Sequence, residues 1–421
     1  MKGRVVVACS LFVLLAGCAL FLGRHDDEHD MSYLYQPAQN VLHPRFLVYH
    51  EEPERSVLIA RLVTSELMFS AANELVIEQA VLCFDYRLFE MNEARTLVVS
   101  DTVLRKVRKD QVKDDYIATI PFPAESGKRY ILEVITTDTI RDRAIQTYLL
   151  VDKSGPFTRQ NFYPVNLKEN KPYFYTFVDT SNRVSLRYNQ PVDSLYVRFF
   201  LNTYPEAPPP DLMIPGDVLR NIPDTSWVIP LDGSQPIAFP FEGMYHIQAD
   251  TSQPEGITFY NMGVSYPQIK YADQMVGPLS YVATPEQYRQ IIRTPNLKLA
   301  SDNFWLETAR NMESARELIR VFYNRVFFAN YYFTSYKEGW KTDRGMIYTI
   351  YGPPHILYKT DDDEEWIYGN PMKKNTISFV FERKIIPYSD NHYVLRRGEA
   401  LVTRWGQAID SWRSGQVYNV D

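Results

Sequence analysis

The residues that could do chemistry in this chain are scattered and form no complete catalytic motif. His246, His355 and His392 stand singly, with neither an HExxH nor a Cys-x-x-Cys pattern, so the tertiary fold alone would have to assemble any transition-metal site. The chain has no Gly-x-Ser-x-Gly elbow and no phosphate-cradling loop. Two carboxylates could still meet at the separation used by glycosidases. We therefore predict a non-enzymatic protein with no catalytic residue, metal or cofactor, and keep as the least favoured alternative a hydrolase with groups converging near Asp343 or His355.

The densest acidic run in the chain, Asp-Asp-Asp-Glu-Glu at residues 361–365, offers the hard oxygen ligands that calcium prefers. It lacks the glycine and the alternating ligand spacing of a calcium loop. We therefore predict that this run is a solvated hairpin loop. A second charged run, residues 25–30, contains two histidines and is interpreted as a solvated tether.

The most individual segment of the chain spans residues 338–354 and reads EGWKTDRGMIYTIYGPP. Its residue types indicate a tight turn, because Gly339 permits unusual backbone geometry, Trp340 can bury a large ring, and Thr342 or Asp343 can cap the next element. Residues 346–351 are predicted to form a strand that ends at the following glycine and prolines.

An arginine in this segment, Arg344, needs a carboxylate partner if it is buried. Within the sequence we expect it to pair with its neighbour Asp343, or with a carboxylate of the preceding helix such as Glu307 or Glu317.

This segment resembles the signature of the GWxTD-domain family, extracytoplasmic proteins best known from Bacteroidota and Acidobacteriota, whose activity is not established. The resemblance extends over residues 284–417. It implies a helical lead-in around Phe304-Trp305 and residues 323–333, followed by strands at residues 366–368 and 379–381. Residues 307–312 depart from the Arg-Asp-Pro-Thr-like turn of the family. The motif residues that either determine the fold or form a binding groove are Gly339, Trp340, Thr342, Asp343, Arg344, Gly345, Tyr348, Tyr351, Gly352, Pro353, Pro354, Trp366 and Tyr368.

The N-terminus has the pattern of an export signal. Lys2 and Arg4 precede an uncharged apolar run over residues 5–23. Within that run, residues 15–18 read Leu-Ala-Gly-Cys and resemble the bacterial lipobox, which implies cleavage after residue 17 and lipidation of Cys18. Acyl chains on this thiol would anchor the protein in a membrane. An uncleaved signal anchor is the alternative, because the run is long enough to span a bilayer.

The residue after the lipidated cysteine is Ala19 rather than aspartate, which resembles the default for sorting to the outer membrane. We therefore expect an outer-membrane lipoprotein that faces the periplasm. The formal net charge of −6 leaves no basic excess, so no nucleic-acid partner is predicted. After lipidation of Cys18, the remaining cysteine of the mature chain is Cys83, which we predict to occupy a strand core position.

Aromatic residues make up 14% of the chain, a proportion that fits β-structure in an extracytoplasmic protein. Seven β-prone runs separated by polar turns predict an immunoglobulin-like β-sandwich over residues 44–153. These runs are residues 46–50, 56–62, 79–89, 96–100, 116–122, 129–136 and 145–151. Residues 66–78 are predicted to form either a short helix or an irregular crossover.

A second β-sandwich is predicted over residues 154–270, with strands at 173–177, 183–188, 195–201, 227–231, 243–249 and 257–263. Residues 204–210 contain three consecutive prolines, which favour an extended surface loop. This proline loop is interpreted as a stiff connector, with partner docking as the alternative.

The remaining residues, 284–421, predict an α+β domain. Thr284 caps a helix over 285–293, and a cap at Ser301-Asp302 begins a long amphipathic helix to Phe333 that is interrupted near Asn311. Strands at 346–351, 366–368, 377–383 and 392–396 and a helix over 401–412 follow. The fold class is therefore multidomain and mainly β, with residues 1–17 as the signal peptide and 18–43 as the lipidated N-terminus and tether.

These features lead us to expect a structural or interaction component of an envelope assembly or secretion system, with the membrane and envelope proteins as its partners. A carbohydrate- or peptidoglycan-binding lipoprotein is the alternative. It would require an exposed aromatic platform for a glycan partner, for which the candidates are Trp340, Trp366, Trp405 and Trp412.

Overall fold

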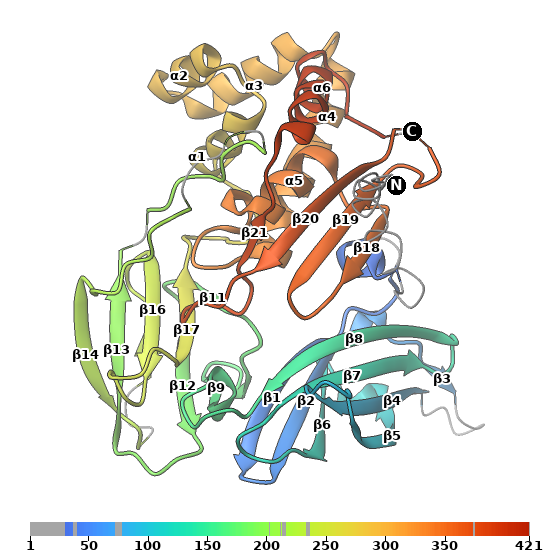
Figure 1. The fold of residues 1–421 in the computed structure, drawn as a ribbon, viewed down its shortest axis with the longest axis vertical. Coiled ribbons are helices and arrows are strands. Elements are labelled where there is room, and N and C mark those ends of the chain that lie inside the picture. The colour runs from blue at the N-terminus through green and yellow to red at the C-terminus, as the bar shows by residue number, and fades with distance from the viewer. Residues whose placement is uncertain are drawn as a thin grey trace, which may run out of the picture.

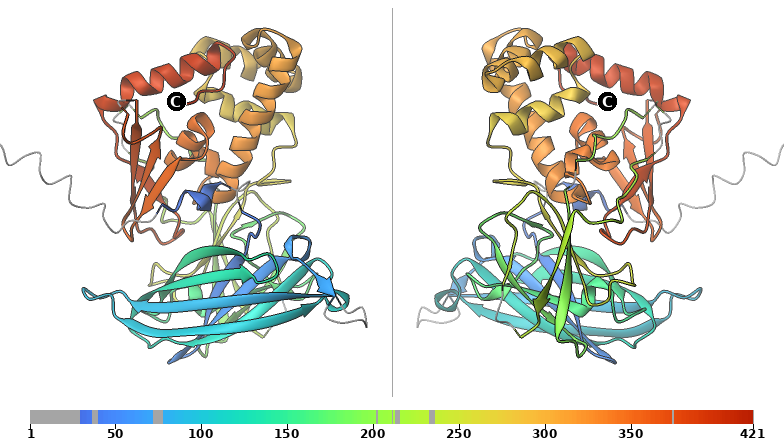
Figure 2. Two further views of the ribbon diagram at one scale, coloured as in Figure 1. Left: turned by 90° about the vertical axis from the view of Figure 1, so that its right-hand side faces the viewer. Right: turned by 90° about the vertical axis from the view of Figure 1, so that its left-hand side faces the viewer.

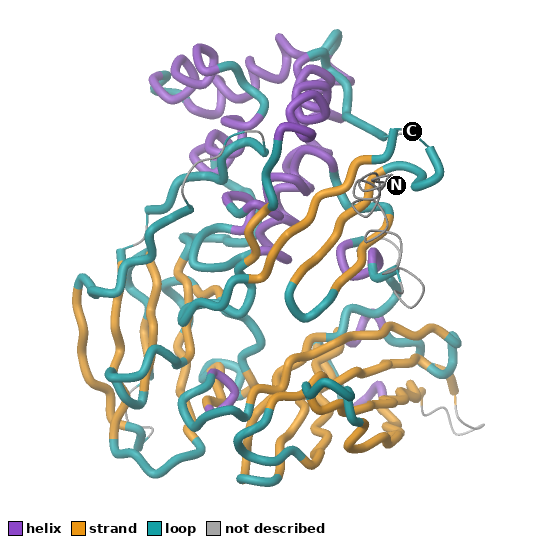
Figure 3. Tube along the Cα trace, viewed as in Figure 1, coloured by secondary structure: helices purple, strands orange, loops and turns teal. Residues whose placement is uncertain are grey.

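The computed structural model describes residues 30–36, 40–71, 78–201, 203–210, 212, 216–232, 236–373 and 375–420. The described chain forms two β units, whose strands pair antiparallel apart from one short parallel pair, and one unit that combines helices with a sheet (Figure 1). The two β units lie side by side, and the helices gather at the opposite end of the molecule (Figures 2 and 3). The fold is thus multidomain and mainly β, as the sequence predicts.

The first β unit confirms all seven strands predicted between residues 46 and 151. One sheet has the order β1-β2-β6, and the other has the order β3-β4-β7-β8, with β5 also paired to β4. The two sheets enclose a core of aliphatic and aromatic side chains that includes Leu62, Leu82 and Leu132. The strands are β1 (Arg45–Glu52), β2 (Arg55–Val63), β3 (Ser70–Ala71), β4 (Glu78–Glu90), β5 (Leu97–Arg108), β6 (Asp115–Pro123), β7 (Arg129–Asp138) and β8 (Arg143–Asp152).

One prediction for this unit is wrong. Cys83 lies in β4 but is only half-buried, while its neighbours Leu82 and Phe84 are fully buried. Side chains alternate between the two faces of a strand, so Cys83 faces away from the core that its neighbours fill. Residues 66–78 were predicted to form either a short helix or an irregular crossover. Of these, residues 72–77 lie outside the described residues.

The second β unit also consists of two sheets, with the orders β10-β9-β12-β15 and β11-β17-β16-β13-β14. Five of the predicted strands are confirmed, whereas the one at 173–177 is reduced to Phe177–Val178, and the strand at Phe162–Asn166 was not predicted. The strands are β9 (Phe162–Asn166), β10 (Lys171–Pro172), β11 (Phe177–Val178), β12 (Arg183–Tyr188), β13 (Ser194–Phe200), β14 (Thr225–Pro230), β15 (Ile237–Ala238), β16 (Gly243–Gln248) and β17 (Ile257–Asn261).

Every residue of strands β16 and β17 is buried, whereas in β12 buried residues alternate with more exposed ones. One face of these strands packs in the core of the second β unit, through Tyr245 and Phe259. The other face contributes Met244 and Tyr260 to a smaller apolar cluster with Tyr336 of the third unit. The third unit therefore covers a face that would otherwise be exposed to solvent.

The third unit places a four-stranded antiparallel sheet, in the order β18-β19-β20-β21, against a layer of helices (Figure 1). Its core is the largest apolar cluster among the described residues. The elements are α1 (Ala272–Val276), α2 (Pro285–Arg293), α3 (Leu297–Thr308), α4 (Met312–Phe333), a 3-10 turn η7 (Gly339–Lys341), α5 (Asp343–Tyr351), β18 (Ile356–Lys359), β19 (Asp363–Tyr368), β20 (Ile377–Arg383), β21 (Tyr393–Leu395) and α6 (Val402–Arg413).

Two of the three helix predictions hold. Thr284 caps α2 with Pro285 in the first turn, and α6 lies where residues 401–412 predict it. The single helix expected from Ser301 to Phe333 is instead two helices, because the Asn311 side chain accepts a hydrogen bond from the Ser314 amide at 2.8 Å and begins α4. Asn296, and not Ser301-Asp302, caps α3.

The strand predicted at residues 346–351 is wrong, because these residues form the last two turns of helix α5. Every residue of α5 is buried. A helix surrounded by protein on all sides needs no polar face, so it has no helical periodicity to reveal it. Its β-branched and aromatic residues then read as a strand.

Within the described residues, no helix combines the length and the apolar character needed to cross a membrane. The apolar run at residues 5–23, the lipobox and Cys18 lie outside the described residues.

Candidate functional site

The Gly-Trp-x-Thr-Asp motif forms a turn that leads directly into helix α5. Thr342 is the N-cap of α5, since its hydroxyl accepts a hydrogen bond from the Gly345 amide at 3.1 Å. The same hydroxyl donates to the Gly339 carbonyl at 2.7 Å, which ties the turn η7 to the helix start. The predicted cap is therefore confirmed at Thr342.

The two glycines of the motif are required by the close approach of backbones. A Cβ atom on Gly345 would lie 1.8 Å from the Gly339 carbonyl oxygen, and one on Gly339 would lie 2.1 Å from the Ala329 carbonyl oxygen. No larger residue fits at either position unless helix α4, turn η7 and helix α5 move apart. The motif thus sets how closely these three elements pack.

Trp340 is buried beside helix α4, as predicted. Its backbone amide donates to the Asn330 side chain of α4 at 3.1 Å, and its ring lies edge-on to the ring of Tyr281 at 5.9 Å. Tyr281 in turn donates its hydroxyl hydrogen to the Trp340 carbonyl at 3.1 Å. The tryptophan therefore joins the motif to the start of the helical layer.

Asp343 does not cap the turn. Its carboxylate accepts hydrogen bonds from the Leu395 amide at 2.8 Å and from the Arg397 guanidinium at 2.5 and 3.2 Å. Arg397 also donates to the carbonyl of Pro208 at 3.0 Å. Asp343 thus holds together helix α5, the end of the sheet and the proline loop.

The proline loop packs on the motif at further points. The Ala207 amide donates to the Lys341 carbonyl at 2.8 Å, and Ala207 belongs to the core of the third unit. Lys337 donates to the Pro205 carbonyl at 3.1 Å and pairs with Asp217 at 2.6 Å. This segment is therefore occupied by intramolecular contacts.

Arg344 pairs with none of the carboxylates expected from the sequence. Its partner is Glu364 of strand β19, at 3.1 Å, while Glu317 lies on the exposed side of α4 and pairs with Arg320. The Arg344 guanidinium also lies over the ring of Tyr393 at 3.9 Å. A partner that is distant in sequence was inaccessible to sequence reasoning.

Glu364 overturns the prediction that residues 361–365 form a solvated loop, because its side chain is 0% exposed. It accepts hydrogen bonds from the Tyr35 hydroxyl at 2.9 Å and from the Trp366 indole at 3.1 Å, in addition to its ion pairs with Arg344 and Lys359. Burial alone raises the pKa of Glu364, but the two cations outweigh it and lower that pKa to about 2. Glu364 is therefore ionised and fully paired.

Tyr35 lies in residues 18–43, which the sequence predicts to be the lipidated N-terminus and tether. In the structure, the 3-10 turn η1 (Ser32–Tyr35) lies beside β18 of the third unit (Figure 1). The Met31 amide donates to the Leu357 carbonyl at 2.8 Å, and Tyr348 donates to the Tyr35 carbonyl at 3.0 Å. Residues 30–36 are therefore part of the third unit.

The remaining motif residues close the other end of α5. Gly352, with φ of 82°, follows the helix, and its carbonyl accepts a hydrogen bond from Tyr368 at 2.8 Å. Arg325 donates to the Ile350 carbonyl at 2.7 Å, and burial lowers the pKa of Arg325 to about 10. The structure gathers the predicted motif residues around α5, including Tyr351, Pro353 and Trp366. The Pro354 carbonyl accepts a hydrogen bond from the Gln36 side chain at 2.7 Å.

The other candidates from the sequence do not converge. His246 lies in β16, His355 precedes β18, and His392 precedes β21. In the part of the chain that the structure describes, no group of three or more metal-ligating side chains could hold a metal ion. The four tryptophans proposed for a glycan platform are buried, at 8% exposure for Trp340, 0% for Trp366, 7% for Trp405 and 1% for Trp412.

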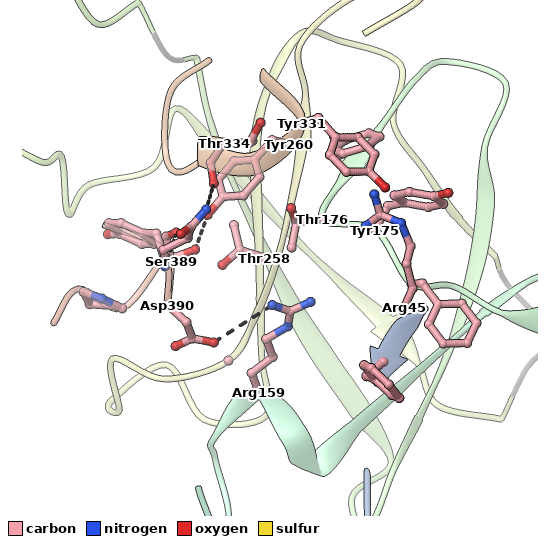
Figure 4. Close-up of a pocket in the computed structure, with 17 residues that line it drawn as sticks. Arg45, Arg159, Tyr175, Thr176, Thr258, Tyr260, Tyr331, Thr334, Ser389 and Asp390 are labelled. Atoms are coloured by element: carbon pink, nitrogen blue, oxygen red, sulfur yellow. Dashed lines mark hydrogen bonds and ion pairs between the residues drawn. The ribbon is translucent and has the colours of Figure 1, made fainter. Parts of the chain in front are cut away.

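A cavity of about 270 Å³ lies where the three units meet, and we call it the junction pocket (Figure 4). Its polar lining combines residues of the first unit, the loop that follows it, the second unit and the third unit. They include Arg45, Arg159, Thr258, Tyr331 and Asp390. No sequence motif links these residues, because the fold brings them together from segments far apart in the chain.

The family model described as the GWxTD domain matches residues 243–414. This match agrees with the geometry of the motif, whose glycines, tryptophan, threonine and aspartate are all used in one packed turn. Residues 243–414 therefore form a GWxTD domain, and we call the chain a GWxTD-domain protein on that basis. The match to the GWxTD domain begins at Gly243, the first residue of β16, whereas the sequence motifs predict a start at Thr284. This earlier start agrees with the burial of β16 and β17 against the third unit.

No curated protein matches this GWxTD-domain protein. Among solved structures, it is similar to a Bacteroides uniformis β-glucuronidase, with 12% identity over 26% of this chain and 13% of that chain, at a TM-score of 0.17. B. uniformis β-glucuronidase 2, covalently bound to cyclophellitol-6-carboxylate aziridine, matches with 11% identity over 28% of this chain and 15% of that chain, also at 0.17. The chain thus spans a small part of these enzymes, and likenesses this low carry no inference about it.

Proposed function

We propose that this GWxTD-domain protein is a non-enzymatic structural and interaction component of a bacterial envelope. It is held at the outer membrane by a lipid on Cys18 and faces the periplasm, where its partners are proteins of an envelope assembly or secretion system. The export signal and the lipobox-like residues 15–18 support this location.

The observation that carries the proposal is that Asp343 and Arg344, the two charged residues at the start of α5, are buried and point into the protein. Asp343 pairs with Arg397, and Arg344 pairs with Glu364. A catalytic group must be able to reach a substrate, whereas these groups are buried and already hydrogen-bonded. Their arrangement favours a role in holding the proline loop, the N-terminal segment and the helical layer as one body.

Strand β14 provides a surface on which a partner could dock. It is the outermost strand of its sheet, and within the described residues it pairs only with β13 (Figure 1). Val228 is 54% exposed, the side chain of Trp227 is also exposed, and residues 225–231 carry no charge. Exposed edge strands without charged residues accept an added strand, so the expected partner contributes an extended segment.

The two alternatives are less well supported. A glycan platform has lost its candidates, because the four tryptophans are packed inside the third unit. The hydrolase proposal depended on Asp343 or His355. Asp343 is engaged by Arg397, and the His355 ring nitrogen Nδ1 accepts a hydrogen bond from the Gly369 amide at 2.9 Å.

Membrane fractionation of the wild-type protein and a Cys18→Ala variant tests the location. We expect the wild-type protein in the outer-membrane fraction and the variant outside it, because the variant has no thiol to lipidate. A variant that remains in the outer membrane would contradict the lipid anchor.

Photocrosslinking in intact cells tests the interaction. A crosslinkable residue is placed at Val228, and at Ile385 as a control that is exposed, apolar and in another unit. We expect one envelope protein to crosslink at Val228 only and to co-purify in stoichiometric amount with the wild-type protein. A Val228→Lys variant should lose it, because a charge on the edge opposes strand addition. Equal crosslinking at both positions, or no stoichiometric partner, would contradict the proposal.

A further inference from the structure

The junction pocket contains an arginine, Arg45, that forms no ion pair with an acidic side chain of the described residues. The Arg45 guanidinium lies between the rings of Tyr175, at 4.5 Å, and Tyr331, at 4.2 Å. Its Nη2 atom is buried and has no hydrogen-bond partner among the described residues. The two rings hold the guanidinium in place by cation–π contact, but they cannot accept its in-plane hydrogen bonds.

An unsatisfied buried donor is costly, so its presence calls for an explanation. Elsewhere in this molecule, Arg344 is also stacked on an aromatic ring, but its nitrogens donate to Glu364 and Asn391. Arg45 is likewise stacked on aromatic rings, but it has no carboxylate partner among the described residues. An oxyanion in the junction pocket would supply the missing acceptor.

A second arginine of the pocket is also weakly paired. Arg159 contacts Asp390 at 4.0 Å, the limit for an ion pair, and the Asp390 side chain is 66% exposed. Arg45, Arg159 and Asp390 are the charged residues that line the pocket, so positive charge is in excess there. Figure 4 shows both arginines bordering the same space.

A neighbouring cavity extends the available space. It has a volume of about 890 Å³ and shares Phe174, Tyr175 and Phe177 with the junction pocket. The junction pocket alone is slightly smaller than a typical small-molecule site. The shared aromatic residues connect the two cavities, so a ligand whose anionic group lies in the junction pocket has room to extend into the larger cavity. That cavity is lined by aromatic rings and by charged residues of both signs.

We propose that the junction pocket binds an oxyanion, a carboxylate or a phosphate, through the guanidinium groups of Arg45 and Arg159. Guanidinium groups present several donors in one plane and bind both kinds of oxyanion with paired hydrogen bonds. This inference is independent of the proposed envelope partner, because it concerns a different surface from β14.

Isothermal titration calorimetry of the mature full chain tests the proposal with three probes. Inorganic phosphate represents phosphates, N-acetylalanine represents carboxylates, and N-acetylalanine methyl ester is the uncharged control. We expect phosphate, N-acetylalanine or both to bind with a dissociation constant of about 1 mM or lower, and the ester not to bind. The arm that binds identifies the kind of oxyanion.

Variants decide whether the bound anion is in the junction pocket. We expect Arg159→Gln and Arg45→Gln each to weaken binding at least about tenfold, as loss of a charge-assisted hydrogen bond predicts. Arg316→Gln, at an exposed position of α4, should bind as the wild-type protein does. Arg159 makes few contacts, so its variant keeps the test valid if Arg45→Gln fails to fold.

Three results would overturn the proposal. The first is that neither anion binds at concentrations up to about 10 mM. The second is that the methyl ester binds as tightly as the acid. The third is that a folded Arg159→Gln variant retains wild-type affinity.

Discussion

Arg344 in the GWxTD motif and Arg45 in the junction pocket are the same residue type in contrasting environments. Each guanidinium lies on two aromatic rings, Tyr393 and Phe333 for Arg344, and Tyr175 and Tyr331 for Arg45. Arg344 is paired with a fully buried carboxylate, whereas the Arg45 guanidinium has no acidic partner among the described residues.

The difference separates a structural charge from a charge available to a ligand. A buried ion pair with complete hydrogen bonding fixes the elements that carry it, and breaking it leaves a charge without compensation. An arginine that is stacked but not paired contributes little to the fold and retains free donors. We therefore expect substitutions in the motif to reduce stability strongly, and substitutions in the junction pocket to affect binding more than stability.

The largest effect is expected for Gly345→Ala. The added Cβ would meet the Gly339 carbonyl oxygen at 1.8 Å, so turn η7 and helix α5 could not remain in contact. We expect a loss of about 5 kcal/mol or more in the free energy of unfolding, measured by urea denaturation. The control is Gly406→Ala in α6, where nothing lies within 4 Å of the added atom. There the change should stabilise the helix by about 0.5–1 kcal/mol. Similar losses in the two variants would contradict the steric role of the motif.

Glu364→Gln should be the next most harmful change. It removes the carboxylate that compensates Arg344 and Lys359, and we expect a loss of about 3–5 kcal/mol in the free energy of unfolding. Glu382→Gln is the matched control, since Glu382 pairs with Lys384 and Arg396 but its side chain is 41% exposed. The control should change the free energy of unfolding by less than about 1 kcal/mol. Equal effects would show that the buried cluster is not a structural centre.

Acid should weaken the fold first through buried histidines and only at lower pH through Glu364. Burial lowers the pKa of His246 in β16 to about 4, below the 6.5 of an unfolded histidine. Between these values the unfolded chain binds a proton that the folded chain does not, so stability falls as the pH falls from about 6.5 to about 4. The loss from His246 should reach roughly 3 kcal/mol in the free energy of unfolding.

The contribution of Glu364 to stability is lost at lower pH, from its ordinary pKa of 4.5 down to about 2. Urea denaturation at a series of pH values, with His246→Gln for comparison, measures the histidine contribution. A His246→Gln variant with the same pH dependence as the wild-type protein above pH 4.5 would exclude His246 as the cause.

The smallest effect on stability is expected for Arg45→Met. The substitution loses cation–π contacts with Tyr175 and Tyr331 but also removes a buried donor without a partner. These contributions oppose each other, and we expect the free energy of unfolding to stay within about 1 kcal/mol of the wild-type value. A thermal melt without ligand measures the change. A loss comparable to that of Glu364→Gln would remove the contrast between the two arginines.

Local patterns in the sequence predict much of the fold. Alternating β-prone runs locate the strands of the first β unit, and Thr284 with Pro285 locates the start of α2. These signals are local. A strand with one face exposed to solvent alternates polar and apolar residues along the chain. A helix cap depends on residues within one turn of the helix start. Helix α5 was missed for the converse reason, since burial on all sides removes the polar face that marks a helix.

The sequence by itself determined the mainly β, multidomain architecture and the GWxTD motif. It also limited the N-cap to Thr342 or Asp343, because a cap depends on residues close in the chain. Gly339 was expected for unusual backbone geometry, whereas the structure requires glycine there because the Ala329 backbone of α4 lies against it. Only the tertiary structure decided which charges are paired. Glu364 became the partner of Arg344, Tyr35 joined the core, and Arg45 met Arg159 in one pocket. Such contacts join segments far apart in the chain, and local sequence patterns carry no information about them.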